Sequence, residues 1–336
     1  MGKVRLADIA QKVGISLVSV SNALSGKPGI SEEKRQEIID VATKMGYDFS
    51  KYEKNINDIK GKQIGVLVPQ KFLEVDHSFY WELYQNLVCE ISKKESFAVL
   101  EILPNEMIEN LKMPNIIKDG QADALFVVGK TSKKYALKLN REFLKPLVFL
   151  DYHEDELNCD SVEFNNYLGM YKVTKYLLAM GHRKIAFVGN IYATNSICDR
   201  YYGMLRALLE EEIVLPDEWT ISDRVLESGK IQITLPKHMP TAFICNSDLS
   251  ASYLMEELKK NGYRVPQDVS VAGFDNFQTD SEYADWLTTY DVNKRGMASE
   301  GMKMIINRLR NPEDKRIKRK IVDGRVLIKE SVRKIS

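Results

Sequence analysis

The sequence has few of the residue patterns that carry catalysis or anchor a protein in a membrane. It contains 4 cysteines and 4 histidines in 336 residues, and neither type has the spacing of a zinc site. A P-loop, a GxGxxG after a strand, a GxSxG and an HExxH are all missing. No apolar run approaches the ~20 residues of a membrane span, and the N-terminus lacks the apolar segment of a signal peptide. We therefore expect no enzyme activity, cofactor or metal, and a cytoplasmic location.

The cysteines are scattered, at Cys89, Cys159, Cys198 and Cys245. Three of them stand beside apolar or small residues, which is typical of buried, reduced thiols.

The chain also lacks a strong charge of either sign. Its 48 Lys and Arg against 47 Asp and Glu give a net charge of +1. Residues 1–61 hold ten basic and eight acidic residues, a weaker basic footprint than DNA binders usually have. Apolar residues at 44% and the length of 336 residues are typical of a globular protein of two or three compact units.

Two short amphipathic stretches open the chain, in VRLADIAQKVGISLVSVSNALSGK at 4–27. Leu6, Ile9, Ala10 and Val13 form the apolar stripe of a first helix, and Gly14 interrupts it. A second helix follows from a Ser16 N-cap. This pattern predicts a helix-turn-helix, although an ordinary helical hairpin has the same signature. Because Arg5 occupies the usual cap position of the first helix, we expect Asp8 to reach back as its cap.

The second helix carries short uncharged side chains that its core does not need. Asn22 can bond an adenine edge in two places, and Leu17 or Val18 can contact a thymine methyl. These residues stand near the N-terminal end of the helix, which is the end that meets base edges. The predicted DNA contacts in this region are Arg5, Ser16, Leu17, Val18, Ser19, Ser21 and Asn22. A third helix is predicted from Ser31, with Ile38, Val41, Ala42 and Met45 as its buried face.

From residue 62 onward, buried strands alternate with helices. Apolar runs bounded by Gly or Pro predict parallel strands covered on both faces, at 64–69, 97–103, 124–129, 147–151, 184–189, 241–246 and 269–275. Because seven strand–helix steps exceed one small sheet, we expect a second subdomain to begin near Asp160.

Ligands of open α/β sheets bind beyond the carboxyl ends of the strands. That rule selects Asp151 and Asp275 at strand ends, the aromatic residues 79–81 after the first strand, and Arg200 at the start of a helix. Carboxylates can bond paired hydroxyls and aromatic rings can stack on a sugar, and Trp286 is a further stacking candidate. Other interpretations stay open: the aspartates can cap turns, and residues 79–81 can belong to a helix core or a dimer face.

The headpiece sequence LADIAQKVGIS…VSVSNALSGKPGISEEKRQEII resembles the lactose-repressor (LacI) family of bacterial transcriptional regulators. The stretches IGVLVP at 64–69, GHRKIAFVG at 181–189 and VPQDVSVAGFDN at 265–276 are similar to landmarks of that family, in its order and at its spacing. The resemblance covers nearly the whole chain.

The resemblance implies an all-α helix-turn-helix headpiece at 1–47, a hinge at 48–61, and an α/β effector domain at 62–336 like the periplasmic binding proteins. Two doubly wound parallel-sheet subdomains are expected, 62–160 with 291–319 and 161–290 with 320–336. The family's effector contacts fall on Phe79, Tyr80, Asp151, Arg200 and Asp275. Its hinge wedge, which parts base steps in the minor groove, falls on Ile56.

These observations predict a homodimeric repressor that binds a pseudo-palindromic operator under the control of a small molecule, with a sugar expected in the cleft. Two other classes stay open, a cytoplasmic sugar-binding protein and an α/β sugar-metabolising enzyme. The N-terminal helix pair argues against the first, and the missing nucleotide loop argues against the second.

Overall fold

The computed structural model describes residues 4–24, 30–48, 59–73, 79–225, 230–277, 283 and 285–335. The chain forms two compact units, one of residues 1–62 with 93–96 and one of the remaining residues. The predicted Ile56 wedge and most of the predicted hinge lie outside the described residues.

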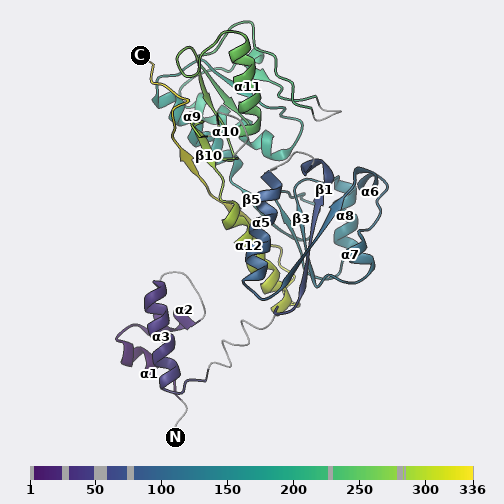
Figure 1. Ribbon diagram of the computed structural model, residues 1–336, viewed down its shortest axis with the longest axis vertical. Coiled ribbons are helices and arrows are strands. Elements are labelled where there is room, and N and C mark those ends of the chain that lie inside the picture. The colour runs from purple at the N-terminus through teal and green to yellow at the C-terminus, as the bar shows by residue number, and fades with distance from the viewer. Residues whose placement is uncertain are drawn as a thin grey trace. The chain divides into compact units, whose positions relative to one another are not determined.

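The first unit is built on three helices, α1 (Leu6–Val13), α2 (Leu17–Leu24) and α3 (Glu32–Lys44) (Figure 1). Their apolar stripes meet in one small core of Ile9, Ala10, Val20, Ala23, Ile38 and Ala42. Gly14 ends α1 in the left-handed conformation, with φ 72°, and its N–H donates to the Ala10 carbonyl at 2.9 Å. A residue without a Cβ adopts this conformation at no steric cost, so the turn between α1 and α2 stays short.

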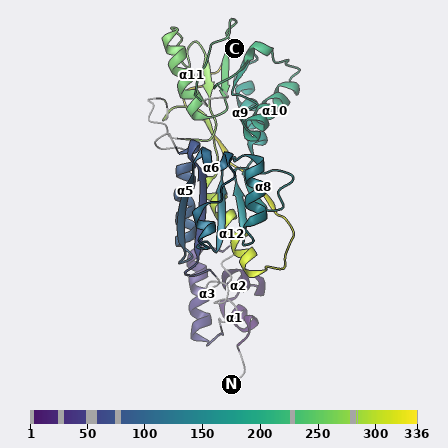
Figure 2. The same cartoon turned by 90° about the vertical axis from the view of Figure 1, so that its right-hand side faces the viewer.

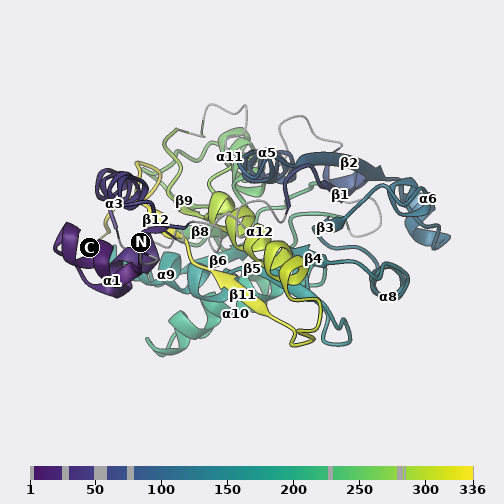
Figure 3. The same ribbon diagram turned by 90° about the horizontal axis from the view of Figure 1, so that it is seen from below.

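The second unit contains two parallel sheets. The first has the strand order β11-β5-β4-β3-β1-β2, from β1 (Gln63–Pro69), β2 (Phe97–Leu103), β3 (Ala124–Val128), β4 (Leu147–Leu150), β5 (Asp160–Phe164) and β11 (Arg319–Val322). Helix α12 (Lys294–Arg310) lies beside α5 (Phe79–Ser92) and over β4 and β5 (Figure 3). The opposite face carries α6 (Asn105–Glu109), α7 (Asn115–Lys118) and α8 (Lys133–Glu142). The helices thus cover both faces, as the unbroken apolar strands predict.

The second sheet has the order β7-β6-β8-β9, from β6 (Ile185–Val188), β7 (Thr220–Ile221), β8 (Ala242–Cys245) and β9 (Ser270–Ala272). Helices α9 (Asn166–Ala179) and α10 (Asn195–Leu209) lie on one side and α11 (Asp248–Lys260) on the other (Figure 2). Helices α9 and α10 approach closely at Gly203, where a Cβ would lie 2.1 Å from the Tyr167 carbonyl oxygen.

Two antiparallel strands run between the sheets, β10 (Thr289–Asp291) and β12 (Arg325–Leu327). The chain leaves the first sheet after β5, returns through β10 into α12, and leaves again after β11. The expected subdomain boundaries at 160/161 and 319/320 fall within β5 and β11, two strands that both pair within the first sheet. Short polar edges such as RKIV give little strand signal in the sequence.

The expectation for the cysteines is wrong in part. Only Cys245 is buried; Cys89 is exposed, and Cys159 and Cys198 are half-buried. Apolar neighbours in the sequence do not decide whether a cysteine is buried. Cys89, for example, lies on the solvent-exposed side of α5.

No helix of the described residues is long and apolar enough to cross a membrane. Within that same part of the chain, no group of His, Cys, Asp and Glu is arranged to hold a metal ion.

Candidate functional site

Helix α2 is held at its N-terminal end by its own cap and at its C-terminal end by α3. The Ser19 backbone N–H donates to Ser16 Oγ at 3.0 Å, and the Arg35 guanidinium donates to the Ala23 carbonyl at 2.9 Å. Asp8 accepts a hydrogen bond from the Arg5 backbone N–H at 2.7 Å, which is the cap expected for α1.

The predicted DNA-contact residues of α2 divide by exposure. Leu17 and Val18 are large apolar side chains that are 50% and 65% exposed, whereas Val20 is fully buried in the core. Ser21 and Asn22, which follow Val20 on the same helix, are half-buried. Exposed apolar groups at the start of a helix are unusual on a surface that meets only water, and they suit contact with thymine methyl groups. The DNA-binding roles of these residues remain predictions.

The second unit gathers polar side chains at the carboxyl ends of its strands. Asp151 follows β4 and Asp275 follows β9, and both adopt positive φ, 58° and 94°. Such backbone conformations cost energy in non-glycine residues and cluster at binding sites. The Tyr80 hydroxyl at the start of α5 donates to Asp151 Oδ2 at 2.9 Å. Two of the predicted effector residues are therefore in direct contact.

Arg200 is buried and tightly held. Its Nε donates to Asn166 Oδ1 at 2.8 Å, and its Nη1 donates to the Asn246 carbonyl oxygen at 2.5 Å. Its guanidinium carbon lies 4.1 Å from the centre of the Phe274 ring, a cation–π contact. Neither Asn166 nor Asn246 was predicted, and their only sequence signal is a position at a helix start or a strand end.

The charges of this group act on one another. Burial raises the pKa of Asp151 and of Asp275 to about 6 each, and the positive charge of Arg200 opposes the rise in both. Burial lowers the pKa of Arg200, while the two aspartates raise it. Burial and the Asp151 carboxylate also raise the pKa of Tyr80 well above its usual range. The arrangement brings together one cation and two carboxylates that water does not fully solvate, and a ligand with several hydroxyl groups can bond both kinds of group.

Asp248 has a different role from the one its position suggests. Ser247 is the N-cap of α11, and its Oγ accepts a hydrogen bond from the Ser250 N–H at 3.1 Å. The Asp248 carboxylate instead accepts from Thr289 Oγ1 at 2.6 Å and from the Phe277 N–H at 3.1 Å. Burial and the nearby Asp275 raise its pKa well above the usual range. Asp248 is therefore not the helix cap, because its side chain turns inward toward β10.

A small polar pocket adjoins this group. It is lined by residues from both subdomains: Tyr80, Lys130, Asp151, Tyr152, His153, Glu163, Asn166, Thr194, Asn195, Ser196 and Asp199. His153 Nδ1 lies 2.5 Å from Glu163 Oε2, and Lys130 Nζ donates to the Ala193 carbonyl at 3.4 Å. The sequence reasoning found only Tyr80 and Asp151 among these residues, since the others follow strands and helices with no recognisable motif.

Two predicted effector residues lie at the margin of this arrangement or away from it. Phe79 contacts the Tyr80 ring edge-on at 5.2 Å and the Phe164 ring at 5.8 Å. Trp286 packs with Tyr283, ring centres 5.6 Å apart, against the apolar core beside α11. Its place in that core favours a packing role for Trp286 over the predicted stacking on a ligand.

Comparison with known proteins gives matches at both ends of the chain. The profile of the bacterial regulatory proteins, lacI family, matches residues 5–49, and that of the periplasmic binding protein-like domain matches residues 174–332. The HTH-type transcriptional repressor PurR of Mannheimia succiniciproducens is 24% identical over 344 residues, covering 98% of this chain and 99% of that protein.

Two solved structures have the same fold. One, described as the complex of the transcriptional regulator CelR with cellobiose, has a TM-score of 0.66 at 18% identity and covers 98% of this chain and 100% of its own. The other, described as the Lac repressor dimer bound to operator and an anti-inducer, has a TM-score of 0.62 at 18% identity and covers 99% and 100%.

Proposed function

Because this chain belongs to the LacI family of bacterial regulatory proteins and is not an enzyme, we propose that it is a repressor whose operator binding is controlled by a sugar. The sugar binds between the two subdomains of the second unit, at Tyr80, Asp151, Arg200 and Asp275. The protein acts as a homodimer on a pseudo-palindromic operator in the bacterial cytoplasm.

The observation that carries the sugar site is the buried cation of Arg200, which interacts electrostatically with two aspartates whose pKa values burial raises. Hydroxyl groups donate to carboxylates and accept from a guanidinium, so one polyhydroxyl ligand satisfies all three side chains at once. The pocket beside them is also lined mainly by polar side chains. A regulator of the same fold whose structure contains cellobiose supports this ligand class.

The DNA-binding part of the proposal rests on α2. Its exposed N-terminal residues Leu17 and Val18, with Asn22 further along the helix, are suited to base edges. Two copies of the headpiece would read two half-sites related by a two-fold axis.

The dimer part is supported by an apolar surface on the first subdomain, the α5–β2 face, which comprises Trp81 and Tyr84 of α5 with Ile102 of β2. Strand β2 is an edge strand of the first sheet. Exposed aromatic groups together with an unpaired strand edge are typical of a surface that a second copy covers.

The test is a thermal-shift screen of mono- and oligosaccharides that includes cellobiose, followed by calorimetric titration. A sugar that binds the folded state raises its melting temperature by mass action. Arg200→Ala and Asp275→Ala should each abolish the sugar's effect on operator binding while operator affinity in its absence stays intact. Arg206→Ala is the matched control, because Arg206 lies on the same helix with its side chain 55% exposed. Unchanged sugar affinity in both cleft variants would contradict the site.

A further inference from the structure

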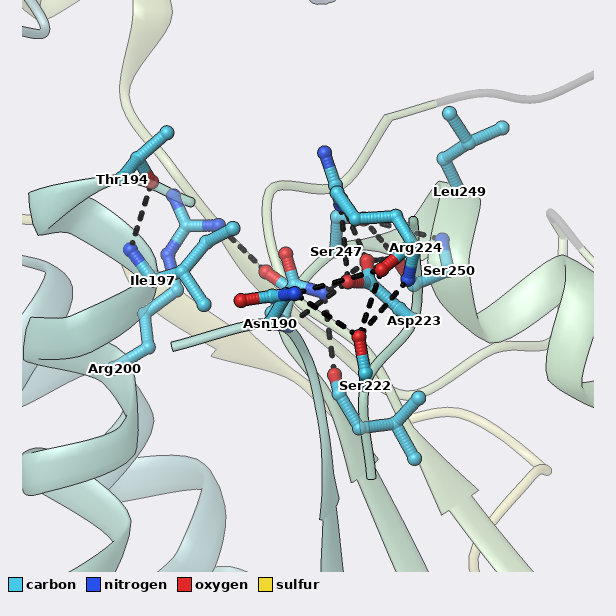
Figure 4. Close-up of polar contacts among 12 residues, drawn as sticks. Asn190, Thr194, Ile197, Arg200, Ser222, Asp223, Arg224, Ser247, Leu249 and Ser250 are labelled. Carbon is cyan, nitrogen blue, oxygen red and sulfur yellow. Dashed lines mark hydrogen bonds and ion pairs between the residues drawn. The ribbon is translucent and has the colours of Figure 1, made fainter. Parts of the chain in front are cut away.

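The carboxylate of Asp223 is completely buried and accepts five hydrogen bonds. Asn190 N and Arg224 Nε donate to Oδ1 at 2.9 and 3.0 Å. Arg224 Nη2, Asn246 Nδ2 and Ser250 Oγ donate to Oδ2 at 2.6, 2.8 and 2.6 Å (Figure 4). The donors come from the segments after β6, β7 and β8 and from α11, so this one side chain joins the carboxyl-end loops of the second sheet.

One of those donors, Asn246, also contacts Arg200, a residue of the proposed sugar site. The Asn246 side-chain amide donates to Asp223 Oδ2, and the backbone carbonyl of the same residue accepts from Arg200 Nη1 at 2.5 Å. Asn246 is 1% exposed and its backbone N–H donates to the Val188 carbonyl at 2.8 Å. The Asn246 amide also donates to the Val188 carbonyl at 3.2 Å and to Ser250 Oγ at 3.1 Å, so Asp223, at 2.8 Å, is the nearest of three acceptors that hold the residue whose carbonyl receives Arg200.

We propose that Asp223 is a positioning residue for effector binding, which holds Arg200 in its binding geometry through Asn246. The proposal rests on the proposed function in so far as Arg200 contacts the effector. Asp223 itself does not line the pocket beside Asp151. Its contribution is to hold the cation ready before a ligand arrives, which lowers the ordering cost of binding.

A carboxylate is required here because all five groups that meet it are donors. In Asp223→Asn the new amide nitrogen would face the Asn246 amide or the Ser250 hydroxyl, and at least one donor would lose its acceptor. Asn246 would then turn, and its carbonyl would move away from Arg200. Solvent would reach the guanidinium of a residue that is now 8% exposed.

The chain contains a matched control in Asp160. This carboxylate is also buried. It accepts hydrogen bonds from Arg308 Nε at 2.8 Å, from Arg308 Nη2 at 2.6 Å and from the Lys318 backbone N–H at 2.8 Å. It lies in the first sheet, and none of these partners contacts Arg200. Asp160→Asn therefore removes a buried, arginine-bound carboxylate that has no link to Arg200.

The test measures the solvent exchange of the Arg200 Nη1–H, the group that donates to the Asn246 carbonyl, by nitrogen-15 NMR of the full chain, with Arg200→Lys assigning the signal by its disappearance. We expect Asp223→Asn to speed this exchange roughly tenfold, the equivalent of one hydrogen bond, and Asp160→Asn to leave it unchanged. Asn246→Ala, which breaks the link but keeps Asp223, should speed it as well and serves if Asp223→Asn does not fold. Equal exchange in wild type and both linked variants would overturn the proposal, as would equal acceleration by Asp160→Asn.

Because this measurement needs no ligand, it tests the positioning role of Asp223 independently of the proposed sugar site. In the titration with cellobiose, or with a tighter sugar from the screen, Asp223→Asn should weaken binding by roughly the same tenfold factor. In an Arg200→Lys background it should add no further loss, since the two changes act through one contact. Additive losses would mean that Asp223 acts on binding by another route. Fast Arg200 exchange with no sugar bound by any variant would leave the positioning role intact and remove the sugar function.

Discussion

The ammonium group of Lys294 lies 2.8 Å from the Glu82 carboxylate and also donates to the main-chain oxygens of Asp275 and Asn276, at 3.3 Å each. Lys294 is the first residue of α12, and its side chain is 7% exposed. It therefore ties the strained turn that holds Asp275 to α5 of the other subdomain. A buried lysine with three oxygen partners is well satisfied, and its removal leaves all three without a donor.

Replacing Lys294 by Met should weaken sugar binding by about 1–2 kcal/mol, because the turn carrying Asp275 loses two hydrogen bonds. Glu82→Gln should cost less, since the two carbonyl contacts remain and the Glu82 side chain is 44% exposed. The control is Lys303→Met, which removes an exposed ion pair with Glu300 from the same helix. Calorimetric titration measures the sugar-binding free energy of each variant. A larger loss of binding free energy in Glu82→Gln than in Lys294→Met would contradict this role of Lys294.

Asp151→Asn should stabilise the unliganded protein at neutral pH while removing sugar binding. Burial raises the Asp151 pKa to about 6 from its ordinary 3.8, so the folded state holds this proton more tightly than the unfolded state. The stability linked to that proton is present below about pH 4 and is lost as the pH rises through 6. Asparagine tolerates the positive φ and can still accept from Tyr80.

Thermal unfolding of Asp151→Asn measures this effect. We expect a gain on the order of 1 kcal/mol at pH 7.5, reduced because Asp151 is partly exposed, and little gain at pH 4. Asp268→Asn is the control of opposite sign, because hydrogen bonds from Arg264 hold the pKa of that carboxyl well below its usual range. An equal gain at both pH values would show that the charge of Asp151 is not responsible.

Asn22→Ala should cost roughly 1–3 kcal/mol at an operator selected from a random library, with little change on non-specific DNA. Lys12→Ala should weaken binding to both DNAs alike, since a lysine on phosphate carries no sequence information. Fluorescence anisotropy titrations at fixed salt separate the two outcomes. Equal losses on both DNAs for Asn22→Ala would exclude a base contact.

Trp81→Glu should convert the dimer to a monomer in sedimentation-velocity measurements, because a charge would lie within the α5–β2 face that we assign to the second copy. Leu144→Glu, at a site that is 91% exposed before β4, should leave the assembly unchanged. A Trp81→Glu protein that sediments like the wild type would place the dimer contact on another surface.

The sequence by itself determined the helix-turn-helix and the parallel strands, because these depend on local periodicity, and the family was indicated by the resemblance of its motifs. The stripe of Ile9 and Ala10 and the apolar run of β3 each fold the same way wherever they pack. It also placed Asp151, Arg200 and Asp275 at element ends, where the topology of an open sheet collects ligand-binding groups.

Only the tertiary structure decided which of those residues meet and what supports them. The contact of Tyr80 with Asp151 joins residues 71 positions apart, and that of Arg200 with Asn246 joins residues 46 apart. The inward turn of Asp248, the packing of Trp286 against the core and the pairing of β11 with β5 also depend on neighbours that are distant in the chain. Side-chain direction and burial are properties of such long-range neighbours, and no local pattern encodes them.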